Sequence, residues 1–552
     1  MSAVPRELSL RAVPEELRRR YLREGLWTDD TLGALVDACV RARGELPFRI
    51  WSEHRPSISR IADVHAQGRR LAAGLQALGL GPGDVVAFQL PNWAEAAATF
   101  FGLSTLGAVL VPVVHSYGAR ELGFILRQSR ARALITTDRF GRLDYAATVA
   151  TLRPSLPDLE LVLMVTTGDE AVPAGAVSFE QVASSLPIRA PLVVDPDGPA
   201  VIAYTSGTTA EPKGVIHTHR SLLAEIRQLA AIQPAGDRPG LFGAPVAHAI
   251  GMLGGLLLPL YRGRAIHLTD AWRPAAVLEA MRAANLTAGS GATVFLTSLL
   301  DAPEFTMADA ARIGHVGLGS APVPIAVAER AEALGIGVAR AYGSTEHPSI
   351  TGSLPDAPRA ERNRTDGRAL AGVEMRLLDD AGRQVGLGEA GEIWSRGPDL
   401  CAGYTDPALD AETFDADGWY ASGDVGVMDA DGHLTITDRK KDVIIRGGAN
   451  ISAAEIEELV AAMPGVAEVA VVAAPDPRLG EHACAFVRRR PGTTAPDIDA
   501  IRRHLETAGL SRSKWPEELH VVEDFPRTPS GKIKKFVLRD DLRAERSARR
   551  DG

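Results

Sequence analysis

Cysteine is scarce in this sequence, with only Cys39, Cys401 and Cys484 among 552 residues. They lie far apart and form neither a CxxC pair nor a disulfide framework, so we expect a reducing compartment. The first 25 or so residues lack an apolar core, which argues against a signal peptide. Long apolar runs are also missing: the longest, near residues 98–114, contains Pro112 and is shorter than the roughly 20 residues of a membrane span. We therefore predict a soluble, cytoplasmic protein without an integral membrane segment.

An excess of positive charge is absent as well. The 60 Lys and Arg residues against 69 Asp and Glu residues give a formal net charge of −9. A protein with this balance gains little from binding a polyanion, so a nucleic-acid partner is not expected. Hydrophobic residues make up 45% and charged residues 23% of the chain, which excludes a disordered protein. At roughly 150 residues per domain, the length predicts about three or four folding units.

Strand-like and helix-like segments alternate through most of the chain. Residues 85–90 are apolar, residues 93–106 have helical composition, and residues 108–114 are apolar and β-branched again, which predicts a strand–helix–strand unit of a parallel sheet. Similar strand-like runs occur at residues 133–136, 161–165, 200–205, 263–268 and 338–342. After about Gly367, short segments separated by Gly and Asp predict a small antiparallel β region.

The last quarter of the chain has a different pattern. Residues 453–463 and 497–508 look helical and residues 466–474 look like a strand, which predicts a compact α+β domain. Residues 436–445 form a candidate hinge before it. We therefore predict a large N-terminal domain, residues 1–440, of α/β class with parallel sheets, covering helices and the small β region, and a smaller, mobile α+β domain, residues 441–552. The end, residues 543–552, is expected to fray in solvent.

Residues 204–215, with the sequence YTSGTTAEPKGV, carry the most informative motif. A strand leads into a loop of hydroxyl and small side chains with one lysine, and a helix is expected from about Ser221. Such a loop offers backbone N–H groups, hydroxyls and an ammonium group to phosphate oxygens. It is not a Walker A loop, because GxxxxGK[ST] is absent. By its residues alone, it is either a phosphate-binding loop or an ordinary surface turn.

This loop resembles the phosphate-loop signature of the adenylate-forming superfamily, which contains acyl-CoA synthetases, peptide-synthetase adenylation domains and luciferases. Further segments resemble the family in the same order: LGPGD (80–84), GLGSAP (317–322), AYGSTE (341–346), GEIWSRGP (391–398) with Gly403 and Tyr404, YASGD (420–424), DRKKDVIIRGGAN (438–450) and PRTPSGKIK (526–534). Each alone is typical of a turn, a cap or a charged surface. In this order they are specific, and the resemblance covers about residues 52–538. Two departures are Ala210, where the family usually has glycine, and Arg60, where it has an aromatic residue.

The resemblance implies which residues bind ATP. The phosphates would be held by Thr205, Ser206, Gly207, Thr208, Thr209 and Lys213. The adenine side would be formed by Gly319, Ser320, Ala321, Pro322, Tyr342, Gly343 and Ser344, with the Tyr342 ring stacked on the base. Asp424 would bind both ribose hydroxyls, and Arg439 would contact ribose or phosphate.

The same resemblance implies the catalytic groups and the reaction. Thr345 would bond a phosphate oxygen, Glu346 would hold Mg²⁺, and Lys532 would be the catalytic lysine. In the family, a carboxylate attacks the α-phosphorus of ATP to give acyl-AMP and pyrophosphate. The C-terminal domain then rotates about a hinge, here Lys441, and a thiol such as that of CoA enters a tunnel lined here by Gly447 and Gly448. The predicted substrates are thus ATP, CoA and a small carboxylic acid.

The identity of the acid depends on residues 245–255, with the sequence PVAHAIGMLGG. His248 is a candidate to gate the acyl pocket or to orient the carboxylate, and its alternative is a satisfied core or surface histidine. We expect Gly251, Gly254 and Gly255 to leave room for the substrate. No Asp is present to pair with an amine, so an apolar acid (medium-chain fatty, alicyclic or aryl) is favoured over an amino acid. Residues 342–351 most resemble the cyclohexanecarboxylate- and medium-chain fatty acid–CoA ligase branch.

Three alternatives stay open from the sequence. A stand-alone acyl- or aryl-AMP ligase that loads a carrier protein would share these motifs. So would a luciferase-type oxygenase. A non-catalytic nucleotide- or acyl-AMP-binding protein is disfavoured, because Lys532, Glu346 and Asp424 are all intact. The oligomeric state is also left open.

Overall fold

A seven-stranded sheet is the largest sheet of the computed structural model, which describes residues 8–168, 171–205, 212–233, 236, 238–319, 323–446, 449–476, 478–528 and 531–550. Its strands are, in spatial order, β11 (Gly214–Thr218), β10 (Pro199–Tyr204), β4 (Val109–Pro112), β3 (Val85–Gln89), β5 (Ala133–Thr137), β8 (Leu161–Val165) and β9 (Val177–Ser178). All neighbours run parallel except β10 and β11. The central strands are buried on both faces, as their continuous apolar composition requires. The predicted strand–helix–strand unit is confirmed as β3, α4 (Ala94–Leu106) and β4.

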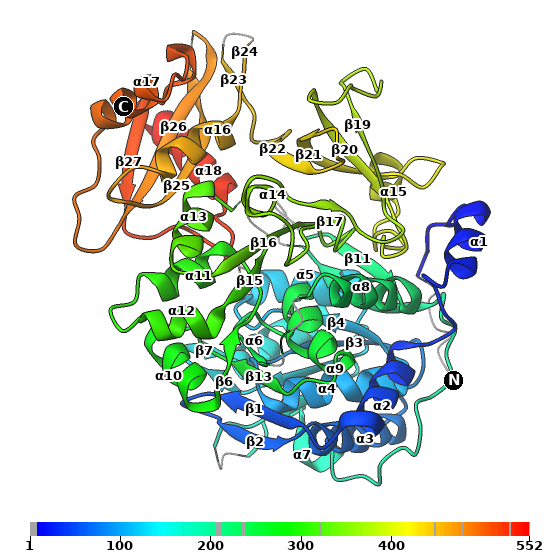
Figure 1. The fold of residues 1–552 in the computed structure, drawn as a ribbon. Coiled ribbons are helices and arrows are strands. Elements are labelled where there is room, and N and C mark those ends of the chain that lie inside the picture. The colour runs from blue at the N-terminus through cyan, green and yellow to red at the C-terminus, as the bar shows by residue number, and fades with distance from the viewer. Residues whose placement is uncertain are drawn as a thin grey trace.

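A second sheet of five strands shares one apolar core with the first. Its strands are β14 (Thr287–Ala288), β12 (Gly240–Phe242), β13 (Ile266–Thr269), β1 (Pro47–Trp51) and β2 (Ser57–Arg60), and only β1 and β2 are antiparallel neighbours. The core also contains apolar residues of α2 (Leu32–Arg43), α3 (Ile61–Ala77), α4, α8 (His219–Ala231) and the π-helix η2 (Gly251–Leu257). These helices therefore join the two sheets, and in Figure 1 α2, α3 and α4 lie in the lower part of the molecule, while α8 lies higher, near β11.

This part also contains further helices and one hairpin. They are α1 (Glu15–Arg23), α5 (Ala119–Ser129), the hairpin β6 (Arg139–Phe140) and β7 (Leu143–Asp144), α6 (Tyr145–Leu152), η1 (Arg153–Ser155), α7 (Phe179–Val182), α9 (Leu258–Tyr261), α10 (Pro274–Ala284), α11 (Thr293–Leu300), α12 (Met307–Ile313), α13 (Ile325–Ala333) and α14 (Arg359–Arg364). A separate core of α10 to α13 packs beside β15 and β16. Among the described residues, no helix has both the length and the apolar character needed to cross a bilayer.

Two smaller sheets lead towards the C-terminal part. The first contains β15 (His315–Leu318), β16 (Gly337–Tyr342), β17 (Thr351–Gly352) and β18 (Arg368–Ala369), with a parallel β15–β16 pair. The second is fully antiparallel and contains β19 (Glu374–Leu378), β20 (Ala390–Arg396), β21 (Tyr420–Met428) and β22 (Leu434–Arg439), with α15 (Ala408–Thr413) between β20 and β21. The predicted antiparallel region after Gly367 is therefore confirmed.

The C-terminal part combines one sheet with helices, as predicted, and lies at the upper left in Figure 1, beside the sheet of β19 to β22. Its elements are β23 (Ile444–Arg446), β24 (Ala449–Ile451), α16 (Ala453–Ala461), β25 (Val466–Asp476), β26 (Gly480–Arg489), α17 (Ile498–Thr507), η3 (Arg512–Lys514), β27 (Glu518–Val522) and α18 (Lys535–Arg550). Two core clusters are formed by residues that all follow Val443. The boundary at residue 440 and the mobility of this part remain predictions.

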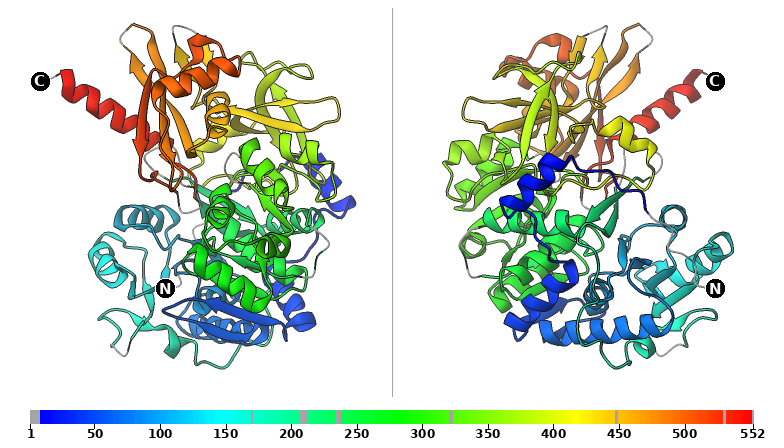
Figure 2. Two further views of the ribbon diagram at one scale, coloured as in Figure 1. Left: turned by 60° about the vertical axis from the view of Figure 1, so that its left-hand side comes forward. Right: turned by 90° about the vertical axis from the view of Figure 1, so that its right-hand side faces the viewer.

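The expectation of a frayed end is wrong over residues 543–550. Helix α18 continues to Arg550 and projects from the molecule in Figure 2. Leu538 and Leu542 are buried against β25 and anchor its first turns, and its residues are mostly good helix formers. The expected fraying was based only on the position of these residues at the end of the chain. Residues 551–552 lie outside the described part of the chain.

Candidate active site

A short loop presents Lys532 to the large N-terminal part. The Thr528 backbone N–H donates to the Lys532 carbonyl oxygen at 2.7 Å, and the Lys532 N–H donates to Thr528 Oγ1 at 3.0 Å. The guanidinium group of Arg527 pairs with Glu468 at 2.6 Å and fixes the base of the loop. At its tip, Gly531 lies directly against Val294 on α11. The loop therefore bridges the C-terminal sheet and the N-terminal part.

The Lys532 ammonium group lies among charges from three predicted motifs. Burial lowers its pKa to about 8, and the nearby Arg439 cation lowers it as well, while Asp424 and Glu346 act in the opposite direction. His248 is its neighbour, because the positive charge of Lys532 adds to burial in lowering the pKa of this histidine to about 4. The fold thus brings together five predicted residues, and the two farthest apart in the sequence, His248 and Lys532, are separated by 284 positions.

Asp424 is the centre of a buried hydrogen-bond cluster. Tyr342 donates its hydroxyl to Asp424 Oδ2 at 2.8 Å, and Arg439 Nε donates to Oδ1 at 2.7 Å. β21 and β22 set this pair, because Asp424 and Arg439 are direct partners in their register. Burial, together with the Asp424 charge, raises the pKa of Tyr342 well above its ordinary value, so its hydroxyl remains a donor. Each carboxylate oxygen keeps lone pairs for further donors, such as those of a cis-diol.

The turn after β16 positions Thr345 and Glu346. Ser344 N–H donates to the His347 carbonyl oxygen at 2.9 Å, and His347 N–H donates back to Ser344 Oγ at 3.1 Å. A side chain at Gly343 would collide with the Pro348 carbonyl group, so only glycine fits this turn. The turn is thus closed by its own hydrogen bonds.

Two residues that were not predicted as site residues form hydrogen bonds to this turn. His217 on β11 donates from Nε2 to the Thr345 carbonyl oxygen at 2.8 Å, and burial lowers the pKa of this histidine, which keeps it neutral. Tyr404 donates its hydroxyl to Glu346 Oε1 at 2.8 Å. Sequence reasoning recognised Tyr404 only as the end of a matched motif. Tyr404 and Glu346 are 58 positions apart in the sequence, and His217 and Thr345 are 128 apart. Local sequence spacing therefore could not reveal either pair.

The Glu346 carboxylate suits a magnesium ion. It is partly exposed, and a hard carboxylate oxygen is a preferred Mg²⁺ ligand. Glu346 belongs to none of the clusters of His, Cys, Asp and Glu that are close enough to hold a metal among the described residues. A single carboxylate of this kind fits an ion that takes its other ligands from nucleotide phosphates and water, which is the usual arrangement for Mg²⁺.

Only part of the predicted phosphate loop and adenine side can be placed. Thr205 and Lys213 close the ends of the phosphate loop, because the Thr205 N–H donates to the Lys213 carbonyl oxygen at 3.0 Å. Lys213 Nζ lies 5.4 Å from the ring centroid of Tyr404. Gly319 donates its N–H to Gly291 at 3.1 Å beside β16. The predicted residues outside the described part of the chain are Ser206, Gly207, Thr208, Thr209, Ser320, Ala321, Pro322, Gly447 and Gly448, together with Ala210.

The glycines after His248 do not leave open space, contrary to expectation. A side chain at Gly251 would collide with the Pro245 carbonyl group, and one at Gly254 would come within 2.8 Å of the Phe242 ring. These two glycines have no side chain, but the Pro245 carbonyl group and the Phe242 ring occupy the space where a side chain would be. These residues belong to the π-helix η2, and Phe242 forms an apolar wall over it.

The predicted hinge residue Lys441 is exposed between β22 and β23. Its carbonyl oxygen accepts from Arg539 Nη1 at 3.3 Å, and the next residue, Asp442, forms an ion pair with Arg539 at 2.6 Å. Helix α18 therefore contacts the candidate hinge directly.

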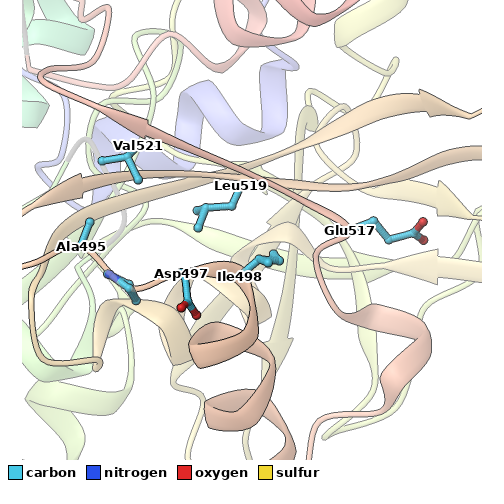
Figure 3. Close-up of a pocket in the computed structure, with 7 residues that line it drawn as sticks. Ala495, Asp497, Ile498, Glu517, Leu519 and Val521 are labelled. Atoms are coloured by element: carbon cyan, nitrogen blue, oxygen red, sulfur yellow. The ribbon is translucent and has the colours of Figure 1, made fainter.

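A cavity of about 420 Å³ opens elsewhere, between the start of α17 and β27 (Figure 3). It is lined by Ala495, Pro496, Asp497, Ile498, Glu517, Leu519 and Val521. None of the predicted site residues lines it, so it adds nothing to the site.

Comparisons with known proteins cover almost the whole chain. The family described as AMP-binding enzyme matches residues 60–405, and the AMP-binding enzyme C-terminal domain matches residues 455–532. The chain is 34% identical to a medium-chain fatty-acid–CoA ligase of Escherichia coli (strain K12), covering 96% of this chain and 93% of the relative. It is 35% identical to a feruloyl-CoA synthase of an Amycolatopsis species, covering 91% and 97%. The solved structure of ATP-bound MatB from Rhodopseudomonas palustris has a TM-score of 0.82 and 27% identity, covering 92% of this chain and 98% of that one.

Proposed function

Because the chain belongs to the AMP-binding enzyme family of AMP-forming acid–CoA ligases, we propose that it activates an apolar carboxylic acid of medium-chain fatty, alicyclic or aryl type. The observation that carries this proposal is the position of Lys532 among Asp424, Arg439, Glu346 and His248. ATP and CoA are the co-substrates of this activity. The substrate carboxylate and ATP are both anions, and the positive charge of the buried Lys532 would reduce the repulsion between them.

In the first half-reaction, an oxygen of the acid attacks the α-phosphorus of ATP, and the bond to pyrophosphate breaks. Both reactants are anions, so positioning and charge neutralisation dominate the barrier. The Lys532 ammonium group lies between the carboxylate and the α-phosphate as a point charge. Asp424 and Arg439 hold the ribose, while Thr205 and Lys213 bind the phosphates. Mg²⁺ held by Glu346 would supply further positive charge to the phosphate oxygens.

In the second half-reaction, the CoA sulfur attacks the acyl carbonyl carbon, and AMP leaves. Lys532 is not needed in this step, because no carboxylate anion then has to approach the α-phosphate. Gly531 in its loop lies against Val294 on α11, and this contact would have to open for the loop to withdraw. We propose Lys441 as the pivot, with the domain boundary near residue 440.

Two observations support an apolar acid. The segment after Pro245 contains no carboxylate that would pair with an amine, and Phe242 adds an aromatic wall beside it. His248 is neutral at pH 7, because burial lowers its pKa to about 4, so it can orient the acid by hydrogen bonding without adding charge. The names of the two similar proteins, a medium-chain fatty-acid–CoA ligase and a feruloyl-CoA synthase, agree with an aliphatic or aromatic tail.

The proposal is tested by AMP release with ATP, Mg²⁺ and CoA across a panel of acids. The panel contains short, medium and long fatty acids, cyclohexanecarboxylate, benzoate, ferulate and amino acids. We expect CoA-dependent turnover to be fastest with a medium-chain, alicyclic or aryl acid. Turnover only with amino acids would reject the substrate class, and acid-dependent pyrophosphate exchange without acyl-CoA would point to a carrier protein as acceptor.

Lys532→Ala separates the two halves in the same assay. Loss of the bridging charge is expected to slow acyl-AMP formation by about 10²–10³, while acyl-CoA formation from supplied acyl-AMP persists. Lys534→Ala is the matched control, because Lys534 lies in the same loop and its described hydrogen bonds, to Pro526 and Val537, involve only its backbone. Equal loss of both halves in Lys532→Ala would reject its assigned role.

A further inference from the structure

Residues 401–405 form a strip that ties two predicted ATP-binding segments together. Tyr404 forms a β-bridge with Val215 on β11, the strand that follows the phosphate loop. The Thr405 N–H donates to the Gly214 carbonyl oxygen at 2.8 Å on the same side. At the other end, the Cys401 N–H donates to the carbonyl oxygen of Glu346 at 2.8 Å. The strip therefore holds β11 and the Glu346 turn at a fixed separation.

The side chain of Tyr404 contacts both segments at their charged groups. Its exposed fraction is only 2%, so its orientation is set by packing. The hydroxyl donates to Glu346 Oε1 at 2.8 Å, and the ring lies 5.4 Å from Lys213 Nζ. The Tyr404 ring also packs against Phe414, whose ring centroid is 6.0 Å away. One phenol thus contacts a predicted metal ligand and a predicted phosphate-binding cation.

This geometry has a direct consequence for the carboxylate. A partly exposed glutamate rotates among several orientations unless another group restrains it. The bond at Oε1 fixes the Glu346 carboxylate plane and leaves Oε2 for a cation. Outer residues that orient a metal ligand in this way typically change metal affinity by about 10–100-fold when removed. A cation over an aromatic face is also attracted by the negative charge density of the ring.

We propose that Tyr404 is a positioning residue for Mg²⁺-bound ATP: its hydroxyl orients the Glu346 carboxylate towards the cation, and its ring orients the Lys213 ammonium group towards the phosphates. The proposal rests on the proposed function, because it takes Glu346 as the ligand of the nucleotide-bound ion. Tyr404 itself touches neither the metal nor the reacting atoms, and it acts through its two neighbours.

The test compares Tyr404→Phe, which keeps the ring and removes only the hydroxyl, with the unaltered protein. Binding is followed by electron paramagnetic resonance of Mn²⁺, used in place of Mg²⁺, in the presence of ATP. We expect Mn²⁺ affinity to fall about tenfold or more, and the Mg²⁺ concentration for half-maximal acyl-AMP formation to rise in parallel. Acyl-CoA formation from supplied acyl-AMP should keep its rate. Tyr404→Leu, which also removes the ring, should weaken ATP binding further.

Tyr145→Phe is the matched control. Its hydroxyl donates to the His115 carbonyl oxygen at 2.8 Å and it is likewise buried, but among the described residues no hydrogen bond links its side chain to a predicted site residue. An equal fall in Mn²⁺ affinity in this variant would overturn the proposal, since any lost buried hydroxyl would then suffice. Unchanged Mn²⁺ affinity and Mg²⁺ dependence in Tyr404→Phe would overturn it as well. Failure of the unaltered protein to form acyl-AMP would instead reject the proposed function, and that result needs no variant.

Discussion

At the scale of single residues, the site combines the buried Lys532 with a second cation, Arg439, and two carboxylates, Asp424 and Glu346. Burial and the charge of Arg439 lower the pKa of Lys532, while the carboxylates of Asp424 and Glu346 act in the opposite direction. The arrangement is therefore suited to a ligand that brings its own negative charge. ATP and a carboxylate are such ligands, and their binding should raise the pKa of Lys532 again.

The first prediction concerns pH. In the free protein, burial lowers the pKa of Lys532 to about 8, so the ammonium form is lost as pH rises through that value. We expect kcat/KM for acyl-AMP formation, measured by pyrophosphate exchange, to fall about tenfold per pH unit above about pH 8, because kcat/KM reports the free enzyme. The fall in kcat should begin at higher pH, since bound anions favour the ammonium form.

Lys532→Arg provides the control for this profile. A guanidinium group stays charged throughout the working range, so the variant should be slower but have a level profile up to about pH 9.5. The same decline in Lys532→Arg would assign the titration to another group. A level profile in the unaltered protein would contradict the lowered pKa.

The residues that sequence motifs nominated and those they missed differ in one physical respect. Tyr342, Asp424, Arg439 and Lys532 were nominated because each occurs in a recognisable local pattern, and the structure brings them together. His217 and Tyr404 act through one hydrogen bond each to a distant turn, which no local pattern encodes. The glycines of η2 were misread for a related reason, because whether a missing side chain leaves space depends on distant atoms such as the Phe242 ring.

At the scale of elements, the candidate hinge is a short connection with a helix resting on it. β22 ends at Arg439 and β23 starts at Ile444, so only a few residues can absorb a rotation. Arg539 on α18 holds two of them, Lys441 and Asp442. The buried strands were predictable from apolar runs, whereas α18 was not, because its order comes from packing of Leu538 and Leu542 on a sheet formed elsewhere in the chain.

Lys441→Pro tests the hinge. Proline fixes φ near −65° and removes the N–H group, which restricts rotation at this residue. We expect acyl-AMP formation to remain within about twofold of normal, while acyl-CoA formation from the bound acyl-AMP slows by tenfold or more, since domain motion gates that step. Rapid-quench measurement of both halves gives the comparison. Lys441→Ala removes the same side chain without restricting the backbone and should be close to normal. An unaffected second step in Lys441→Pro would exclude this residue as the pivot.

At the scale of the whole molecule, one relative placement of the two parts is defined by a few contacts. Glu458 on α16 accepts from the Ile325 N–H at the start of α13 at 2.7 Å, and Arg490 lies 3.7 Å from Asp301. Gly531 rests on Val294 beside them. This placement carries Lys532 into the site, so we assign it to acyl-AMP formation. Each of these contacts favours this placement, so removing one of them is expected to shift its population.

Glu458→Ala should shift that population. It removes the acceptor from a half-buried hydrogen bond between the two parts, a loss of about 1 kcal/mol after allowing for solvent, or roughly fivefold in the equilibrium. Acyl-AMP formation is therefore expected to slow by up to about fivefold, while the second half-reaction, which requires Lys532 to withdraw, keeps its rate or becomes faster.

Glu455→Ala on the same helix is the matched control, because Glu455 is exposed and pairs with Lys514 within the C-terminal part. If both variants slowed both halves equally, the effect would be a general loss of stability. If Glu458→Ala slowed only the second half, the placement seen here would belong to thioester formation, and the role assigned to Lys532 in this placement would fall with it.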